Sequence, residues 1–230
     1  MTLDDKVRYP AFLYVRFAMG KKQDRLQIVT DIKEAAILYK KKLVGKTFLY
    51  VFDNRAIEVI YKASSFMHLT GVESSLSAKE FYKEAVKGKL TANQINFSAR
   101  HPFPLCKKKI IHISSIASFA TSECFMLEDI STSTACYKFG TTDMNFTLCL
   151  NREYDTNGCP KGTNYIVQSL RDEDCFDRSN NVFEVAYIFS KQNDVSQYTD
   201  LEYADSRYSL YNLPESITAL LSSELLTHNL

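Results

Sequence analysis

The stretch Ser65-Phe66-Met67-His68-Leu69-Thr70-Gly71-Val72 joins two segments of different character. Residues 58–62 before it have the β-branched and aromatic residues of a strand, and residues 77–85 after it have a capping-box pattern that predicts a helix. In an extended segment, side chains two apart share a face, so His68 and Thr70 are expected to point the same way. The competing interpretation is a buried structural histidine at a strand end that turns at Gly71.

Working outward, the first half of the chain predicts helices and a hairpin. Apolar residues recur at steps of three or four over residues 24–43, which predicts an amphipathic helix that Gly45 ends. Residues 46–52 and 56–61 predict two strands joined by a turn at residues 53–55. Residues 91–95 begin another short helix, residues 98–107 form a breaker segment, and residues 110–119 form a short helix or a buried connection. Residues 1–22 are interpreted as a tail or a first strand.

The second half has the pattern of a β-rich region. Strands are predicted at residues 135–140, 146–150, 165–171 and 182–191, with a loop at residues 154–163. An amphipathic helix that starts at Pro214 is expected to pack on the sheet. Helices first and strands later indicate the α+β class. We expect an N-terminal extension at 1–22, one domain at 23–205, and a helical tail at 206–230 on the same domain.

Composition narrows the class of protein. With 230 residues, 45% hydrophobic and 24% charged, the chain has the make-up of a soluble globular protein with a substantial core. No run of about 18 apolar residues is present, and residues 4 and 5 are acidic where a secretory signal would be basic, so we expect a cytoplasmic protein without a membrane partner. The six cysteines include no CxxC pair, which predicts free thiols and no metal site. No cofactor motif is present either.

The net charge of +1 conceals a polarity along the chain. Residues 1–115 carry 21 Lys and Arg against 10 Asp and Glu, whereas residues 116–230 carry 7 against 17. The basic half could bind an anion. Equally, the two halves could attract each other within one domain.

Familiar catalytic motifs are absent: there is no P-loop, no dinucleotide fingerprint, no GxSxG and no HExxH. The polar residues at predicted strand ends are the candidates for chemistry, and they are His68, Thr70, Ser169, Arg171 and Lys191. His101 and His112 have no motif around them and are interpreted as structural or surface residues.

Residues 66–72, with Ala78-Lys79-Glu80-Phe81-Tyr82 and Gly88-Lys89-Leu90-Thr91 after them, resemble the phage and mobile-element branch of the barnase–EndoU–colicin–RelE-like nucleases. Ser169-Leu170-Arg171, Phe189-Ser190-Lys191 and Tyr198 are similar to the later part of that pattern. The resemblance covers about residues 24–205. It implies helices packed on a four- to five-stranded antiparallel sheet, and metal-independent cleavage of RNA by a toxin-like protein.

In the reaction that the resemblance implies, the ribose 2′-hydroxyl attacks the adjacent phosphate. A general acid and a general base move the protons, and cations stabilise the phosphorane. His68 suits the proton transfer, Arg171 and Lys191 suit the phosphate, and Thr70 and Ser169 suit hydrogen bonds to its oxygens. Each has a structural alternative: Thr70 as a cap, Ser169 as a strand-end residue, Arg171 paired with Asp172 or Asp174, and Lys191 as an exposed strand terminus.

Two other classes of function remain open. The acidic second half would repel RNA, which favours a non-catalytic binding or inhibitor protein on the same scaffold that acts on a host enzyme or a defence complex. We expect RNA as the partner, with a host or immunity protein as the alternative partner. A transferase acting in a similar cleft is the third possibility, although the sequence has no glycine loop to hold phosphate.

Overall fold

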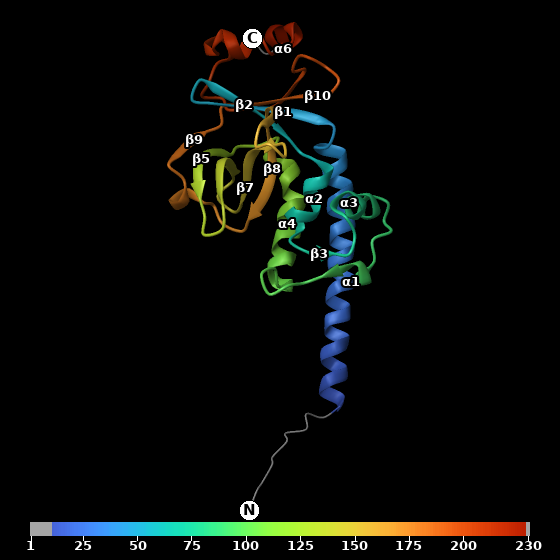
Figure 1. The fold of residues 1–230 in the computed structure, drawn as a ribbon. Helices are drawn as coiled ribbons and strands as arrows, with labels where there is room; N and C mark the ends of the chain where they lie inside the picture. Colours follow the sequence, from blue (N-terminus) through green and yellow to red (C-terminus); the bar gives the residue numbers. More distant parts are fainter. Residues whose placement is uncertain (1–10, 229–230) are drawn as a thin grey trace, which may run out of the picture.

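A computed structural model describes residues 11–228, and within them the side chains of all but residues 11–22, 118 and 228. Figure 1 shows a long helix, α1, that runs past the body of the molecule, with the C-terminal helices at the opposite end. The helices are α1 (Ala11–Lys42), α2 (Phe66–Thr70), α3 (Ala78–Val86), α4 (Phe103–Phe119), α5 (Glu215–Thr218) and α6 (Ser223–His228). The mixed α+β class is as expected.

The sheet is larger than expected. Nine strands form it in the order β11-β10-β1-β2-β8-β7-β6-β5-β9, and all neighbours are antiparallel except β2 and β8. A separate pair, β3 (Glu73–Ser74) and β4 (Ile95–Asn96), completes the strands. The nine are β1 (Lys46–Phe52), β2 (Arg55–Ile60), β5 (Phe125–Ser131), β6 (Cys136–Thr142), β7 (Thr147–Tyr154), β8 (Pro160–Arg171), β9 (Asn181–Glu184), β10 (Tyr187–Gln192) and β11 (Asp200–Ala204). The prediction of a four- to five-stranded antiparallel sheet was therefore wrong.

One reason for the larger sheet is the division of a single predicted strand. Residues 182–191 form β9 and β10, which break at Val185 and Ala186. β9 pairs with β5 at one edge of the sheet, while β10 pairs with β1 near the other. Both halves have strand-forming side chains, so the composition alone does not reveal the break. The backbone N–H groups of the two linking residues bond to Cys124 and Val51.

The stretch at residues 65–72 folds differently from the prediction. Residues 66–70 form the short helix α2, and Gly71 ends it in the left-handed conformation with φ of +72°. Phe66 and Leu69 enter the core, while His68 is exposed. His68 and Thr70 are therefore not alternate residues of a strand, and the expected shared face does not exist.

Helices lie on both sides of the sheet. α1 packs against α3 and α4, and α2 lies against α3, α4 and β8. The main core lies between these helices and the strands, with Tyr39, Phe48, Phe66 and Phe81 fully buried in it. A second cluster on the other side of β1 and β10 buries Leu49, Phe189 and Tyr198 against α5 and α6.

Several boundaries differ from the predictions. The helix predicted at 24–43 is present but begins at Ala11, so α1 runs without a break across the expected boundary at residue 22. Residues 1–10 lie outside the described residues. α4 starts at Phe103 inside the predicted breaker segment. The single helix predicted from Pro214 is two short helices, α5 and α6.

The two oppositely charged halves pair with each other. Ion pairs join Lys46 to Glu202, Arg55 to Glu128, Lys62 to Glu153 and Lys108 to Asp172. Each one links a cation of the first half to a carboxylate of the second. These pairs support the interpretation that the two halves attract each other. A cation that has no such partner is therefore a candidate for binding an anion.

Candidate functional site

A cavity of about 960 Å³ opens where the N-terminal part of α4 meets the C-terminal end of β8. Its volume lies within the range of small-ligand sites. Cationic and hydrogen-bonding side chains from three separate parts of the chain meet there. The cavity is lined by Arg100, His101, Leu105, Lys109, Thr134, Tyr137, Ser169, Leu170, Arg171, Asp172 and Glu173.

Lys109 lines the cavity and lies against the turn after α2. It follows Cys106 on the buried face of α4 and is itself only 8% exposed. A Cβ added at Gly71 would lie 3.1 Å from Lys109 Cδ and 3.5 Å from His101 Cδ2, so the glycine lets both side chains approach the backbone. Burial and then the neighbouring Arg171 charge lower the pKa of Lys109. The predicted motif therefore does not line the cavity itself, but its Gly71 lies against two side chains that do, Lys109 and His101.

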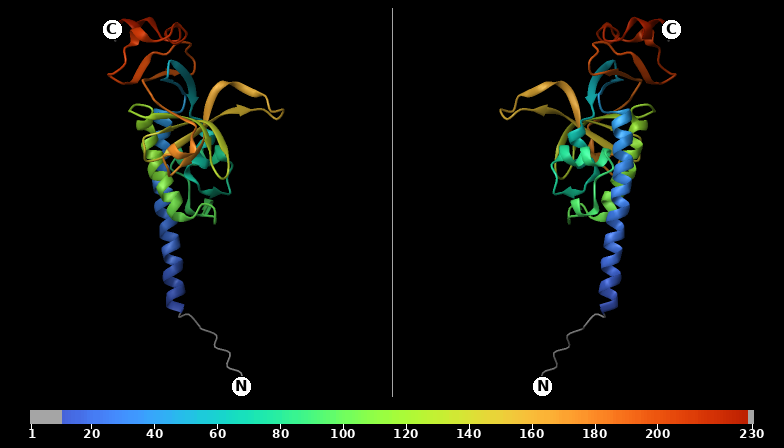
Figure 2. Two further views of the ribbon diagram at one scale, coloured as in Figure 1. Left: turned by 90° about the vertical axis from the view of Figure 1, so that its left-hand side faces the viewer. Right: turned by 90° about the vertical axis from the view of Figure 1, so that its right-hand side faces the viewer.

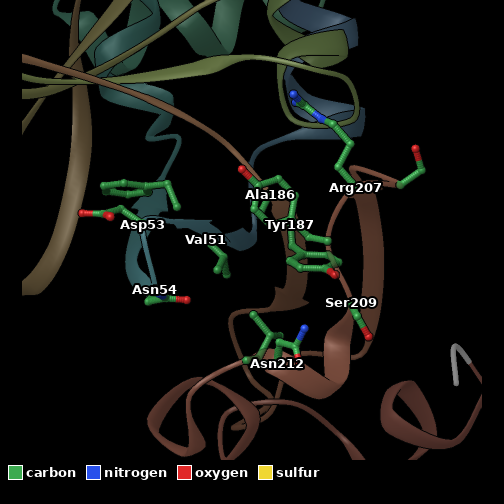
Figure 3. Close-up of a pocket in the computed structure, with 12 residues that line it drawn as sticks. Val51, Asp53, Asn54, Ala186, Tyr187, Arg207, Ser209 and Asn212 are labelled. Carbon is green, nitrogen blue, oxygen red and sulfur yellow. The ribbon is translucent and has the colours of Figure 1, made fainter.

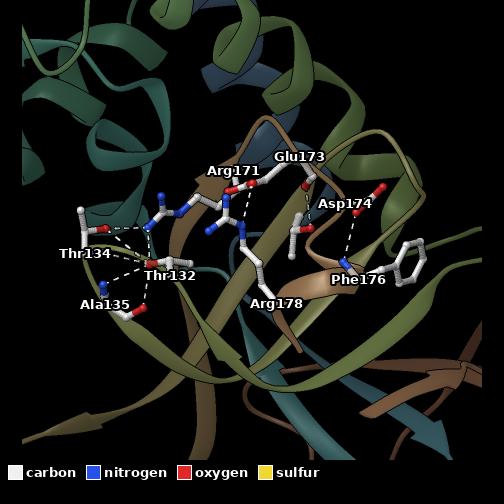
Figure 4. Close-up of polar contacts among 9 residues, drawn as sticks. Thr132, Thr134, Ala135, Arg171, Glu173, Asp174, Phe176 and Arg178 are labelled. Carbon is white, nitrogen blue, oxygen red and sulfur yellow. Dashed lines mark hydrogen bonds and ion pairs between the residues drawn. The ribbon is translucent and has the colours of Figure 1, made fainter. Parts of the chain in front are cut away.

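Arg171 is held by hydroxyl groups. Its Nη2 donates to Thr132 Oγ1 at 3.0 Å and to Thr134 Oγ1 at 2.8 Å, as Figure 4 shows. Its guanidinium carbon lies 6.0 Å from the centre of the Tyr137 ring. Among residues 11–228, neither Arg171 nor Lys109 forms an ion pair with a carboxylate. Hydroxyls orient the fork without neutralising it, so its charge stays available to an anion.

The carboxylates of the cavity lining are already paired with other groups. Asp172 accepts from Lys108 Nζ at 2.8 Å and lies 2.7 Å from His112 Nε2. Glu173 accepts from Arg178 Nε at 3.0 Å. Burial acts to raise the pKa of Asp172, but the bonds from Lys108 and His112 outweigh it and the pKa is lowered. Arg171 therefore forms no ion pair with Asp172 or Asp174, and that structural alternative is wrong.

His101 lies half-buried at the mouth of the cavity, two residues before α4 begins. Burial and then the Lys109 charge lower the pKa of its imidazole. The ring makes no hydrogen bond to the described residues, so both nitrogens are free for a ligand. A neutral imidazole beside two cations is suited to accept a proton.

The five predicted site residues are divided among different places. Ser169 and Arg171 both line the cavity, and the Ser169 hydroxyl has no partner among the described side chains. Thr70 is fully buried, and its Oγ1 donates to the Met67 carbonyl at 2.6 Å and accepts from Val72 N. That hydroxyl closes the end of α2. His68 is exposed on α2 and is not part of the cavity lining.

Lys191 lies on the opposite side of the sheet. It is three strands away from β8 in the sheet order, and its Nζ lies 4.6 Å from the centre of the Tyr198 ring. Nζ donates to the Ser196 carbonyl at 2.8 Å and lies 3.9 Å from Glu58 Oε1. Tyr198 belongs to the cluster beneath α5 and α6. The structure therefore brings together Ser169 and Arg171 but not Lys191.

A second cavity, of about 460 Å³, lies at the turn between β1 and β2. Figure 3 shows Asp53 and Asn54 on one side of it, and Arg207, Ser209 and Asn212 on the other. Here the cation is neutralised: Arg207 donates to both oxygens of Asp205 and to Glu184. This cavity has no free cation in its lining to attract an anion.

These features define an α+β protein with a cationic cavity suited to a phosphate group. The family model described as phage-Barnase-EndoU-ColicinE5/D-RelE like nuclease4 matches residues 31–207. The chain belongs to this nuclease family. No curated protein and no solved structure matches the chain. Within the described residues, no helix is both long and apolar enough to cross a bilayer.

Sequence reasoning missed Lys109 and set His101 aside. One signal for Lys109 was present: Cys106, Lys109, Ile110 and Ile113 follow the spacing of a buried helix face, and a lysine in that pattern is unusual. His101 had no such signal. Only the packing of α4 on α2, and of α2 on β8, places it near Arg171.

Proposed function

We propose that the protein is an endoribonuclease that cleaves RNA without a metal ion, by attack of a ribose 2′-hydroxyl on the adjacent phosphate. The observation that carries the proposal is the cavity in which Lys109 and Arg171 have no carboxylate partner beside the free imidazole of His101. Membership of the nuclease family supports phosphodiester cleavage as the activity.

Two groups of the cavity would move the protons. His101, kept neutral by its lowered pKa, accepts the proton of the 2′-hydroxyl as the 2′-oxygen bonds to phosphorus. Lys109, whose pKa is lowered by burial, donates a proton to the departing 5′-oxygen as its bond to phosphorus breaks. The products are a 2′,3′-cyclic phosphate and a 5′-hydroxyl.

Arg171 and Ser169 would hold the phosphate. The guanidinium nitrogens not bonded to Thr132 and Thr134 face a non-bridging oxygen, where the negative charge grows in the transition state. The Ser169 hydroxyl donates to a second oxygen. Cations of the protein thus stabilise the phosphorane, which is why the proposal requires no metal.

His68 and Lys191 remain alternative candidates for two functions, and both can be tested. His68 is the alternative proton acceptor that the motif favours, and Lys191 the alternative cation. Both lie outside the cavity lining, so the proposal gives their functions to His101 and Lys109.

The test uses two RNA oligonucleotides that differ only by a single 2′-deoxy nucleotide at the cleavage position, incubated with excess chelator. We expect the protein to cut the all-ribose strand, to leave a 2′,3′-cyclic phosphate detectable by mass spectrometry, and to spare the deoxy position. Cleavage at the deoxy position, or loss of all cleavage in chelator, would overturn the mechanism. Binding of RNA without cleavage would favour the non-catalytic alternative.

A further inference from the structure

The parallel contact between β2 and β8 is short. It covers only two residue pairs, Val59 with Tyr165 and Ile60 with Ile166. Before these pairs the two strands separate: residues 55–57 pair only with β1, and residues 161–163 have no strand partner on the side that faces β2. Two strand edges therefore diverge with unpaired backbone groups between them. Such edges are templates for an added strand.

A cavity of about 560 Å³ fills the gap between these edges, and we name it the β2–β8 groove. Strand β2 forms one side, β8 the other, and α5 with the residues after it closes one end. More than half of the lining is apolar or aromatic: Leu49, Ala56, Ile57, Phe139, Tyr165, Ile217 and Leu220. Leu220 is 37% exposed, so the apolar lining continues to the surface. Figure 2 shows the β7–β8 hairpin projecting away from the body of the molecule.

One cation in the groove lacks a counter-charge. Arg152 lies with its guanidinium carbon 5.5 Å from the centre of the Tyr165 ring, and no carboxylate among residues 11–228 pairs with it. Its Nε is buried without a hydrogen-bond partner. The other arginine of the groove, Arg55, is neutralised by two bonds to the Glu128 carboxylate. Glu58, the one carboxylate of the lining, accepts a hydrogen bond from the Tyr198 hydroxyl, so Arg152 keeps its charge and an occupant is expected to carry a carboxylate.

We propose that the β2–β8 groove binds an extended peptide segment of a partner protein, which adds a strand to an open edge and places an acidic side chain on Arg152. The main-chain groups of β2 or β8 supply the ladder, the apolar lining takes alternate side chains, and Arg152 selects for Asp or Glu. The groove is separate from the cationic cavity, because none of its lining residues contributes to that cavity. Binding there does not require the proposed ribonuclease activity.

The test begins with a displayed library of random linear peptides, selected on the full-length protein. We expect the selected peptides to alternate apolar residues with at least one Asp or Glu. One synthetic peptide is then measured by fluorescence anisotropy against three proteins: wild type, Arg152→Gln, and Lys40→Gln as a control at an exposed lysine of α1. Arg152→Gln should weaken binding at least fivefold and Lys40→Gln should not change it.

Two further comparisons show how the peptide binds. N-methylation of alternate peptide amides should weaken binding at least tenfold, because it removes the ladder donors, and Leu220→Glu should weaken it through repulsion and competition for Arg152. Changing the peptide's acid to its amide should weaken binding to wild type but not to Arg152→Gln. The proposal is overturned if N-methylated and plain peptides bind alike, if no selected peptide is sensitive to Leu220→Glu, or if single-stranded RNA displaces the peptide and binds in an Arg152-dependent way.

Discussion

Arg171 and Arg207 both line cavities, but their surroundings differ. Arg171 is held by two threonine hydroxyls and keeps its charge. Arg207 is bonded to Asp205 and Glu184, and these carboxylates raise its pKa beyond that of a free arginine. Arg171 lies beside a second free cation, Lys109, whereas Arg207 lies within an acidic cluster. A cation can bind an anionic ligand only where neighbouring carboxylates leave its charge unpaired, as they do at Arg171 and not at Arg207.

The largest expected effect concerns the proton acceptor beside Arg171. His101→Ala should reduce RNA cleavage by about 10²- to 10⁴-fold, the usual contribution of a general base. His68→Ala is the matched control, since it removes an exposed histidine outside the cavity. Initial rates on one RNA substrate measure both. If His68→Ala abolishes cleavage while His101→Ala retains it, the proton transfer belongs to α2.

The two arginines themselves provide the next test. Arg171→Met should lower cleavage by about 10²- to 10³-fold, as loss of a transition-state donor does, with little change in melting temperature. Arg207→Met should leave cleavage unchanged but lower the melting temperature. Asp205 is only 7% exposed, and the substitution would remove the arginine that bonds to its carboxylate. Equal losses of activity in the two variants would contradict the assignment of Arg171, and not Arg207, to the cleavage site.

A smaller effect is expected at the glycine beside Lys109. Gly71→Ala forces a left-handed alanine at a cost of about 1–2 kcal/mol, measured by urea unfolding, and its Cβ displaces Lys109. Gly88 is the control: its φ is +70°, but a Cβ there meets nothing within 4 Å. Both variants should lose similar stability, yet only Gly71→Ala should also lose cleavage. Unchanged cleavage in Gly71→Ala would mean that the position of Lys109 is unimportant.

The smallest effect is a shift in titration. Because the Lys109 charge helps to lower the pKa of His101, Lys109→Met should raise that pKa and move the protonation step to higher pH. A general base works only when neutral, so cleavage by wild type should fall as pH decreases through this lowered pKa. Proton NMR of the His101 ring measures the shift, with Lys40→Met as the unchanged control. A downward shift in Lys109→Met would contradict the assigned proximity.

Local sequence patterns determined much of the fold. The stripe at residues 24–43 predicted most of α1, the Ser77 and Glu80 pair predicted the start of α3, and the aromatic run at 46–52 predicted β1. These signals are local, because a helix or strand needs only its own periodicity and caps. The motif at residues 66–72, with its downstream matches, also indicated the nuclease family that the family model confirms.

The sheet order and the site were decided by the tertiary structure. The division of residues 182–191 between opposite edges, and the helix at 66–70, depend on partners distant in the sequence, which local propensity does not encode. For the same reason, Ser169 and Arg171 were found from their strand end, while His101 and Lys109 join them only through the packing of α4 on α2 and of α2 on β8. Residue types that bind phosphate can be recognised in the sequence alone. The fold decided which of them keep a free charge in one cavity, because ion pairs across the two halves neutralise several of the others.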